Sequence, residues 1–159
     1  MIMRVTPVLM PLVDVCRLCQ RPYEGHPRGC PNFGKRDTCP PEAGMFAYEF
    51  YGDEVYAICV KFQFGYHVKT MRKKHPDWSE RQLRCCLYWQ GTARKMLREE
   101  IARFILDHPD FTVTACPEAM GVDVTATMQQ AGIHLEWPPE VLTHHVALGA
   151  KLRNSNPLS

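Results

Sequence analysis

The stretch Glu54-Val-Tyr-Ala-Ile-Cys-Val-Lys-Phe-Gln-Phe64 is dominated by β-branched, aromatic and other apolar residues. A run of this length and composition predicts a buried β-strand. Cys59 lies in the middle of the run, so we interpret its thiol as a core side chain rather than as a metal ligand. The run therefore predicts one strand that lies inside the fold.

A capping-box pattern, Ser79-Glu80-Arg81-Gln82, predicts the start of the clearest helix in the chain. The helix is expected to continue to about Leu106, before His108-Pro109, although Gly91 leaves its continuity open. Apolar residues recur at helical steps and predict one buried face. These residues are Leu83, Leu87, Ala93, Leu97, Ile101, Phe104 and Ile105.

Shorter elements are expected on both sides of this helix. Residues 65–77 are interpreted as a basic connection, and residues 111–115 as a strand that ends at Cys116. Gly132 is expected to close a helix that begins near Asp123. Short strands are expected at residues 8–10 and 133–135, and residues 141–152 are compatible with either a strand or a helix.

The alternation of strands and helices predicts an α/β fold, a small single domain over residues 1–159. We expect a partly parallel sheet, one long helix and a Cys-rich metal-binding loop at residues 16–44. This loop is rich in Cys, Pro, Gly, Arg and Asp and has little periodicity, so an irregular path ordered by a metal is expected. The polar tail at residues 154–159 is expected to be frayed.

Composition excludes some classes of protein. The formal net charge of +2 is too small to indicate nucleic-acid binding by itself. Residues 1–15 lack the pattern of a signal peptide, and no stretch approaches the ~18 apolar residues of a membrane helix. We therefore expect a cytoplasmic protein that has reduced thiols and no membrane contact.

Five of the eight cysteines are spaced as metal ligands. Residues 16–39 have the pattern Cys-x2-Cys-x10-Cys-x8-Cys, and a fifth cysteine lies far downstream. Three of these cysteines precede proline, which has no N–H group to satisfy and restricts the local turn. The five predicted ligands are Cys16, Cys19, Cys30, Cys39 and Cys116.

Two metals fit this pattern. Cysteine followed by proline is common in ferredoxin loops, which favours an iron–sulfur cluster of the 4Fe-4S type. Four thiolates also suffice for a structural zinc ion, and His26 is an available substitute ligand. The intervals of ten and eight residues differ from those of common zinc fingers, so we prefer the cluster and keep zinc as the alternative.

The motifs Gly-Cys-Pro-Asn-Phe-Gly-Lys at residues 29–35, Cys-Pro-Pro at 39–41 and Glu-Ala-Met-Gly-Val-Asp-Val at 118–124 occur in this order. They resemble those of a family of predicted metal-binding, iron–sulfur-type prokaryotic proteins catalogued as a domain of unknown function. The resemblance implies metal binding but no established reaction. Many members also carry a second group of closely spaced cysteines, of which only Cys116 remains here.

We expect Cys19, Cys30 and Cys39 to bind together with either Cys16 or Cys116. Glu118 is a weak catalytic candidate, as an acid or base near the metal. Asp123 is interpreted as a helix N-cap, and His144-His145 as surface residues. The sequence leaves open whether the chain is an enzyme.

Basic side chains and one tyrosine fall along one side of the long predicted helix. This basic stripe is a candidate site for an anion, a small substrate or a nucleic-acid backbone, although we favour its interpretation as a solvated helix face. Its members are Arg81, Arg84, Tyr88, Lys95 and Arg98.

Two functions of the protein follow as expectations. The first is an iron–sulfur protein acting in electron transfer, redox or sulfur chemistry on an unidentified redox partner or small substrate. The second is a zinc-stabilised module that contacts nucleic acid through the stripe.

Overall fold

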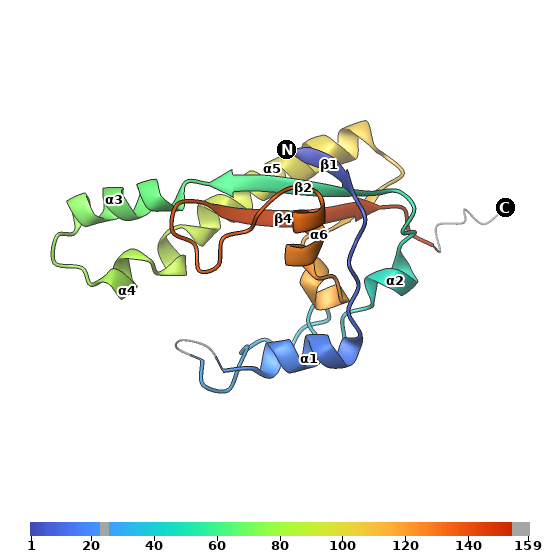
Figure 1. Cartoon of the computed structure of the whole chain (residues 1–159), viewed down its shortest axis with the longest axis horizontal. Coiled ribbons are helices and arrows are strands. Elements are labelled where there is room, and N and C mark those ends of the chain that lie inside the picture. The colour runs from blue at the N-terminus through green and yellow to red at the C-terminus, as the bar shows by residue number, and fades with distance from the viewer. Residues whose placement is uncertain (23–25, 154–159) are drawn as a thin grey trace.

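The computed structural model describes residues 1–22 and 26–153, so the predicted frayed tail lies outside the described residues. A sheet of four strands in the order β1-β2-β4-β3 forms the centre (Figure 1). The strands are β1 (Ile2–Val5), β2 (Val55–Phe62), β3 (Thr112–Thr114) and β4 (Thr143–Ala150). The α/β class, the small single domain and the buried strand near residues 54–64 are confirmed. Among the described residues, no helix has the length and apolar character required to cross a membrane.

The prediction of a partly parallel sheet is wrong, because every pair of neighbouring strands is antiparallel. Strand β4 lies between β2 and β3 and runs against both, so β2 and β3 point the same way without being neighbours. Alternating strands and helices suggested neighbouring parallel strands. The chain instead inserts its last strand, β4, into the gap.

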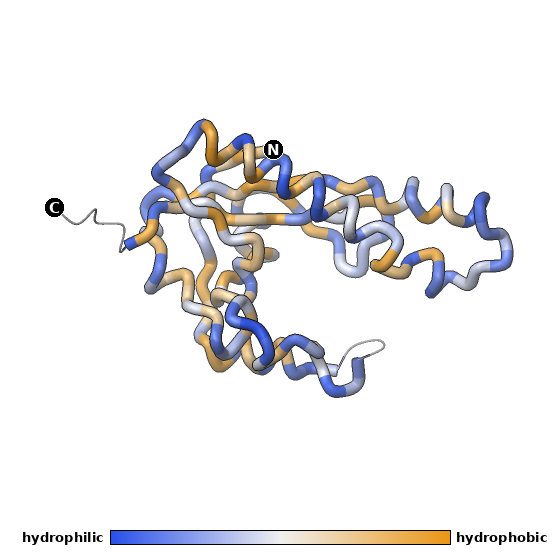
Figure 2. Tube along the Cα trace, turned by 180° about the vertical axis from the view of Figure 1, so that it is seen from behind, coloured by the Kyte–Doolittle hydropathy of each residue, from blue (hydrophilic) through white to orange (hydrophobic). Residues whose placement is uncertain are grey.

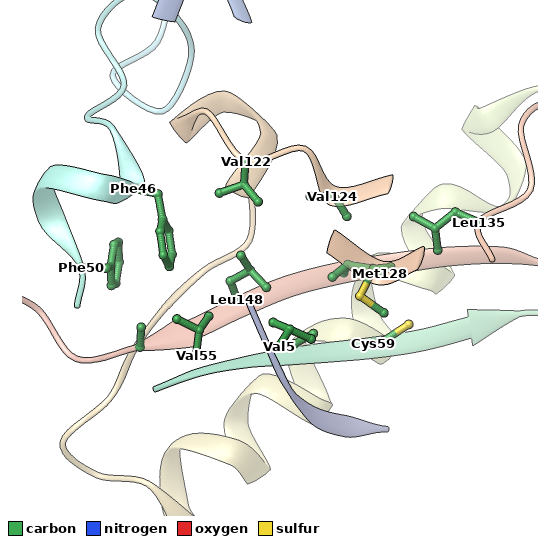
Figure 3. Packing of buried hydrophobic residues seen from close by; sticks show 13 residues of the cluster. Val5, Phe46, Phe50, Val55, Cys59, Val122, Val124, Met128, Leu135 and Leu148 are labelled. Carbon is green, nitrogen blue, oxygen red and sulfur yellow. The ribbon is translucent and has the colours of Figure 1, made fainter. Parts of the chain in front are cut away.

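Both faces of the sheet are covered. Helix α5 (Gln90–Asp107) packs on one face, where Leu97 and Phe104 meet Ile58 and Ala147. The opposite face carries α6 (Val124–Gln130) and α2 (Phe46–Glu49) (Figure 1). Figure 3 shows the core between these helices and the sheet. Its labelled members are Val5, Phe46, Phe50, Val55, Cys59, Val122, Val124, Met128, Leu135 and Leu148.

Cys59 is 1% exposed within this core, which confirms its interpretation as a packed side chain. Its position on β2, opposite Val146 of β4, directs its thiol into the apolar cluster that contains Met128. Desolvation raises the pKa of Cys59, which keeps the thiol protonated and chemically inert.

The predicted long helix is broken. A short helix α4 (Glu80–Leu83) is followed by the 3₁₀ turn η1 (Cys86–Tyr88) and then by α5. The capping box at Ser79 and Gln82 is present as predicted. At the break, the Trp89 ring is buried against Phe64 and Ala93, and its Nε1 donates to the Arg84 carbonyl over 3.2 Å.

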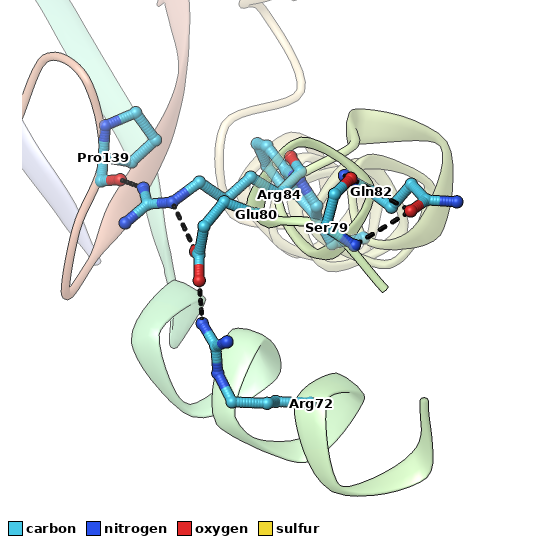
Figure 4. A network of polar contacts seen from close by, with 7 residues as sticks. Arg72, Ser79, Glu80, Gln82, Arg84 and Pro139 are labelled. Atoms are coloured by element: carbon cyan, nitrogen blue, oxygen red, sulfur yellow. Dashed lines mark hydrogen bonds and ion pairs between the residues drawn. The ribbon is translucent and has the colours of Figure 1, made fainter. Parts of the chain in front are cut away.

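The region predicted as a basic connection is helix α3 (Phe64–Lys74). Helices α3 and α4 form an arm that projects beyond the sheet (Figure 1), and Figure 2 shows that its far end is hydrophilic. Glu80 of α4 forms ion pairs with Arg72 of α3 and with Arg84 (Figure 4). Arg84 in turn donates to the Pro139 carbonyl over 3.1 Å, which attaches the arm to the loop before β4.

The remaining predictions are confirmed in part. The Asp123 carboxylate caps α6 by accepting from the Ala126 N–H over 2.9 Å. Gly132, with φ of 81°, ends α6 in the two hydrogen bonds of a Schellman motif. Residues 111–115 and 141–152 contain β3 and β4. Residues 133–135 form no strand, and near residues 8–10 only an isolated bridge joins Leu9 to Val122.

Candidate functional site

The Cys-rich segment begins with a helix that the sequence analysis missed. Helix α1 (Leu12–Gln20) carries Cys16 and Cys19 three residues apart, so both half-buried thiols lie on one side. Val15 is 2% exposed and anchors the helix to the protein. The pair that the pattern predicted as chelating is therefore presented by a helix rather than by an irregular loop.

Cys30 lies against the end of this helix. Its backbone N–H donates to the Cys19 carbonyl over 2.7 Å. The approach depends on Gly29, whose φ is 79° and whose hypothetical Cβ would lie 2.5 Å from the same carbonyl oxygen. Only glycine combines this conformation with this contact.

Cys39 is brought back by turns in the loop. The Gly34 N–H donates to the Pro40 carbonyl over 2.8 Å, and the Ala43 N–H donates to the Cys39 carbonyl over 2.9 Å. Pro40 itself is buried, so the proline after Cys39 has a packing role.

Cys116 joins from the other end of the chain. It is the N-cap of the 3₁₀ helix η2 (Pro117–Met120), with Pro117 buried in the first position. Two hydrogen bonds hold the segment before α1 to this turn: Met10 N–H to the Gly121 carbonyl over 2.7 Å, and Asp123 N–H to the Val8 carbonyl over 2.8 Å. These contacts place α1 beside η2 although about a hundred residues separate them in sequence.

The thiols influence one another electrostatically. Burial raises the pKa of Cys19, and the neighbouring Cys30, Cys16 and Cys39 raise it further. Burial also raises the pKa of Cys116, with added contributions from Glu118 and Cys39, while Arg94 lowers it. The five predicted ligands thus form one group around Cys19 and Cys39, and we call them the cysteine cluster.

The cysteine cluster is not closed around a single point. Within residues 1–22 and 26–153, no three His, Cys, Asp or Glu side chains are arranged to hold a metal ion. All eight cysteines are free thiols. The structure therefore brings the predicted ligands into one neighbourhood without showing a metal site.

A cavity of about 460 Å³ adjoins the cysteine cluster. We call it the cysteine cavity. It lies between α1, η2 and the start of β4, and its walls include apolar side chains such as Val15, Leu18 and Leu135. Its lining also contains six side chains that carry chemistry: Cys19, Cys39, Cys116, Glu118, Asp123 and His144.

Glu118 has an exposed side chain, and it is one of the residues that line the cysteine cavity. Because the surrounding protein desolvates the carboxylate, the pKa of Glu118 is raised, and a hydrogen bond from its own backbone opposes the rise only in part. Its place beside Cys116 keeps it a candidate proton donor or acceptor. The capping contact of Asp123 instead assigns that carboxylate to helix α6.

The prediction that His144 and His145 are surface residues is wrong in one respect. His144 and His145 are half-buried on β4 rather than free on the surface. Burial lowers the pKa of both, helped by Lys61 at His144 and by Arg94 at His145. In the described part of the chain, the buried Nδ1 of His144 has no hydrogen-bond partner. The uninterrupted run Val-Ala-Leu-Gly-Ala at residues 146–150 was a signal that could have placed this pair at the start of a buried strand.

The residues of the basic stripe do not lie along one continuous helix. Arg81 and Arg84 lie on or directly after α4, Tyr88 lies in η1, and Lys95 and Arg98 lie on α5. Arg84 is held by Glu80 and Pro139, and Lys95 is 4.0 Å from Glu99. A single stripe along one helix is therefore wrong, while anion binding by these residues stays a prediction.

Comparison with known proteins adds no relative. No protein-family model, no curated protein and no solved structure matches the chain. The resemblance to the iron–sulfur-type family accordingly stays a prediction based on the cysteine and Glu-Ala motifs.

Proposed function

We propose that this protein binds an iron–sulfur cluster, of the 4Fe-4S type, through the cysteine cluster. The ligands are Cys19, Cys30 and Cys39 together with Cys16 or Cys116. We also propose that the chain belongs to the iron–sulfur-type family that its motifs resemble. The observation that carries the proposal is the convergence of five free thiols from α1, the loop and η2.

The donor set fits a thiophilic centre. Thiolates are the ligands that iron–sulfur clusters and structural zinc ions require. Burial contributes most to the raised pKa of Cys19, and the neighbouring sulfurs add to it, which is the expected effect of negative groups gathered without a central positive charge. A bound cation would reverse this effect, so metal binding and deprotonation of the thiols would be coupled.

Binding would also order the segment. The Cys-rich loop contributes little to the apolar core, and its few turns leave the thiols short of ligand geometry. Small movements of the loop relative to α1 would be driven by bonds to the metal. Cys116 has a special place because it would join the beginning of the chain to η2.

An iron–sulfur cluster, when bound, supplies one-electron transfer. The role proposed for the protein is electron transfer, or redox or sulfur chemistry on a small molecule in the cysteine cavity. Glu118 would exchange a proton at its carboxylate oxygens beside the thiols, and the apolar walls would limit access of water. A reducing, cytoplasmic location is part of the proposal and is supported by eight free thiols.

Metal analysis after anaerobic purification tests the proposal. We expect brown protein that contains iron and acid-labile sulfide. Alanine at Cys30 or Cys39 should abolish the colour, whereas Cys86→Ala serves as the matched control because that thiol is exposed and lies on η1. Comparison of Cys16→Ala with Cys116→Ala identifies the fourth ligand. Colourless protein that contains one zinc ion, or no metal at all after growth with both metals, would refute the cluster.

The α3–α4 arm favours a second candidate function, the zinc-stabilised module that contacts nucleic acid. Residues 66–84 contain six lysines and arginines against two carboxylates, whereas the whole chain carries only +2. Tyr66 is 73% exposed on this arm and is available for stacking, and Tyr88, 50% exposed in η1, packs against Trp78 of the arm. Under this alternative the protein should elute late from heparin with a strong salt dependence. Alanine at Lys69, Lys73 and Lys74 together should remove that retention.

A further inference from the structure

A second cavity, of about 480 Å³, lies along the edge of strand β4. We call it the edge cavity. Strand β3 pairs with β4 only at residues 148–150. In the described structure, residues 143–147 therefore have a strand neighbour on the β2 side alone. Four consecutive residues line the cavity, because it follows the strand edge and meets both faces of the sheet: Thr143, His144, His145 and Val146.

Three aromatic side chains form walls of the edge cavity. Phe64 and Trp89 pack edge to face with centroids 5.3 Å apart, and Trp89 lies 6.1 Å from the His145 ring. Trp137 lines both the edge cavity and the cysteine cavity, yet it is 71% exposed. A large apolar ring left this exposed at a cavity wall has area available to cover a ligand.

The loop that carries Trp137 is held in place before any ligand arrives. A single carboxylate oxygen of Glu136 accepts three backbone N–H bonds from Glu140, Val141 and Leu142, at 2.9, 2.9 and 3.1 Å. Arg84 donates to the Pro139 carbonyl from the other side. The exposed ring is thus mounted on an ordered turn, which reduces the entropy lost on binding.

Positive charge lies at the α5 side of the edge cavity. Gln90 lines the cavity, and Arg94 follows one helical turn later on the same side of α5. Arg94 is exposed and forms no ion pair with another described residue. Arg94 itself does not line the edge cavity; its position one turn beyond Gln90 places it next to the part of α5 that does.

We propose that the edge cavity binds a nucleoside monophosphate, a planar nitrogen heterocycle that carries a phosphate group. The ring would stack on the exposed Trp137, whereas Phe64 and Trp89 are buried and only line the cavity. Its donors and acceptors would meet the unpaired backbone groups of β4. The phosphate would pair with Arg94. The cavity volume falls within the range of small-molecule sites, roughly 300–1,000 Å³.

The position of the edge cavity suggests a relation to the cysteine cluster. The two cavities share Glu118, Trp137, His144 and Val146. A nucleotide in the edge cavity would therefore lie next to the thiols and to the unpartnered Nδ1 of His144. Nucleotide binding itself does not require a metal, whereas a role for the nucleotide as substrate rests on the proposed function.

Titration of the full-length protein with adenosine 5′-monophosphate, followed by tryptophan fluorescence and calorimetry, tests this inference. We expect saturable quenching, since two of the three tryptophans line the cavity. Arg94→Gln should weaken binding about tenfold because a charged hydrogen bond is lost. Arg103→Gln is the matched control, because Arg103 also lies on α5, does not line the edge cavity and already forms an ion pair with Glu100. Adenosine lacks the phosphate, so its affinity for the unmodified protein should be about as low as the affinity of the nucleotide for the Arg94→Gln variant. The Arg94→Gln variant should bind the two ligands equally well.

Trp137→Ala should weaken both ligands about tenfold, while Tyr48→Ala, at a residue that is 78% exposed away from both cavities, should change neither. Cys30→Ala separates the two proposals, because Cys30 does not line the edge cavity. This variant should lose its metal and keep its nucleotide affinity. The inference is overturned if about 5 mM nucleotide leaves fluorescence and heat unchanged, or if Arg94→Gln and Arg103→Gln behave alike.

Discussion

Gly29 offers the sharpest test of how the cysteine cluster is built. An added Cβ at this position would lie 2.5 Å from the Cys19 carbonyl oxygen and 2.7 and 2.8 Å from backbone atoms of Gln20. These are backbone atoms, which cannot turn away as a flexible side chain can. Gly29→Ala must therefore push the loop segment that carries Cys30 away from α1. This movement lengthens the 2.7 Å hydrogen bond between the Cys30 N–H and the Cys19 carbonyl.

The size of the effect follows from two contributions. A side chain at a φ near +79° costs roughly 1–2 kcal/mol, and the steric overlap costs a further ~1–3 kcal/mol. Gly34 is the matched control: its φ is 66°, and its hypothetical Cβ has no atom within 4 Å. The two alanine variants share the first contribution, so their difference isolates the overlap. That difference corresponds to roughly a 10- to 100-fold loss of metal affinity.

The assay is a titration with Co²⁺, followed through the thiolate-to-metal charge-transfer absorption. We expect Gly29→Ala to bind Co²⁺ roughly 10- to 100-fold more weakly than Gly34→Ala, with the far-ultraviolet circular dichroism of both unchanged. Equal Co²⁺ affinities for the two variants would show that Gly29 does not lie against Cys19, or that Cys19 and Cys30 do not bind the same ion.

Three further outcomes are expected from equilibrium unfolding in urea. Gly149→Ala should destabilise the protein by about 1–3 kcal/mol, since its Cβ would lie 2.5 Å from the Phe104 ring. Combining it with Phe104→Leu should relieve part of this loss. If the losses of stability from the two substitutions simply add in the double variant, the contact is contradicted. Asp123→Ala should cost about 1 kcal/mol through the lost N-cap, whereas Asp123→Ser should cost much less, and an equal loss for both would remove the capping role. Burial lowers the pKa of His67, whose Nε2 lacks a partner among the described residues. The unfolded chain therefore takes up the proton more readily as the pH falls below about 6.5, so stability should drop from pH 7 to 5, and His67→Phe should make that drop smaller; an unchanged drop would refute the assignment.

Local patterns identified several elements correctly. The run at residues 54–64 contains β2, and the capping signals at Ser79 and Asp123 mark real helix starts. Each of these signals depends on side chains that act within a few residues of themselves. The burial of Cys59 was predictable for the same reason, since an apolar run places its central residue in the core.

Elements that depend on distant contacts were missed. The helix α1 was hidden by the high content of cysteine, proline and arginine around it. The break before α5 coincides with the burial of Trp89 against Phe64, a contact across about 25 residues of sequence. The direction of β4 depends on which gap in the sheet it fills, and no local pattern encodes that choice.

The candidate site likewise combines features that depend on local sequence with features that depend on distant contacts. The sequence by itself determined the donor chemistry, because the identity and spacing of Cys16, Cys19, Cys30 and Cys39 require no knowledge of the fold. Only the tertiary structure brought Cys116, Glu118 and His144 to the walls of one cavity. The reason is physical: these side chains meet through η2 and β4, which are positioned by hydrogen bonds and apolar packing between segments far apart in the chain.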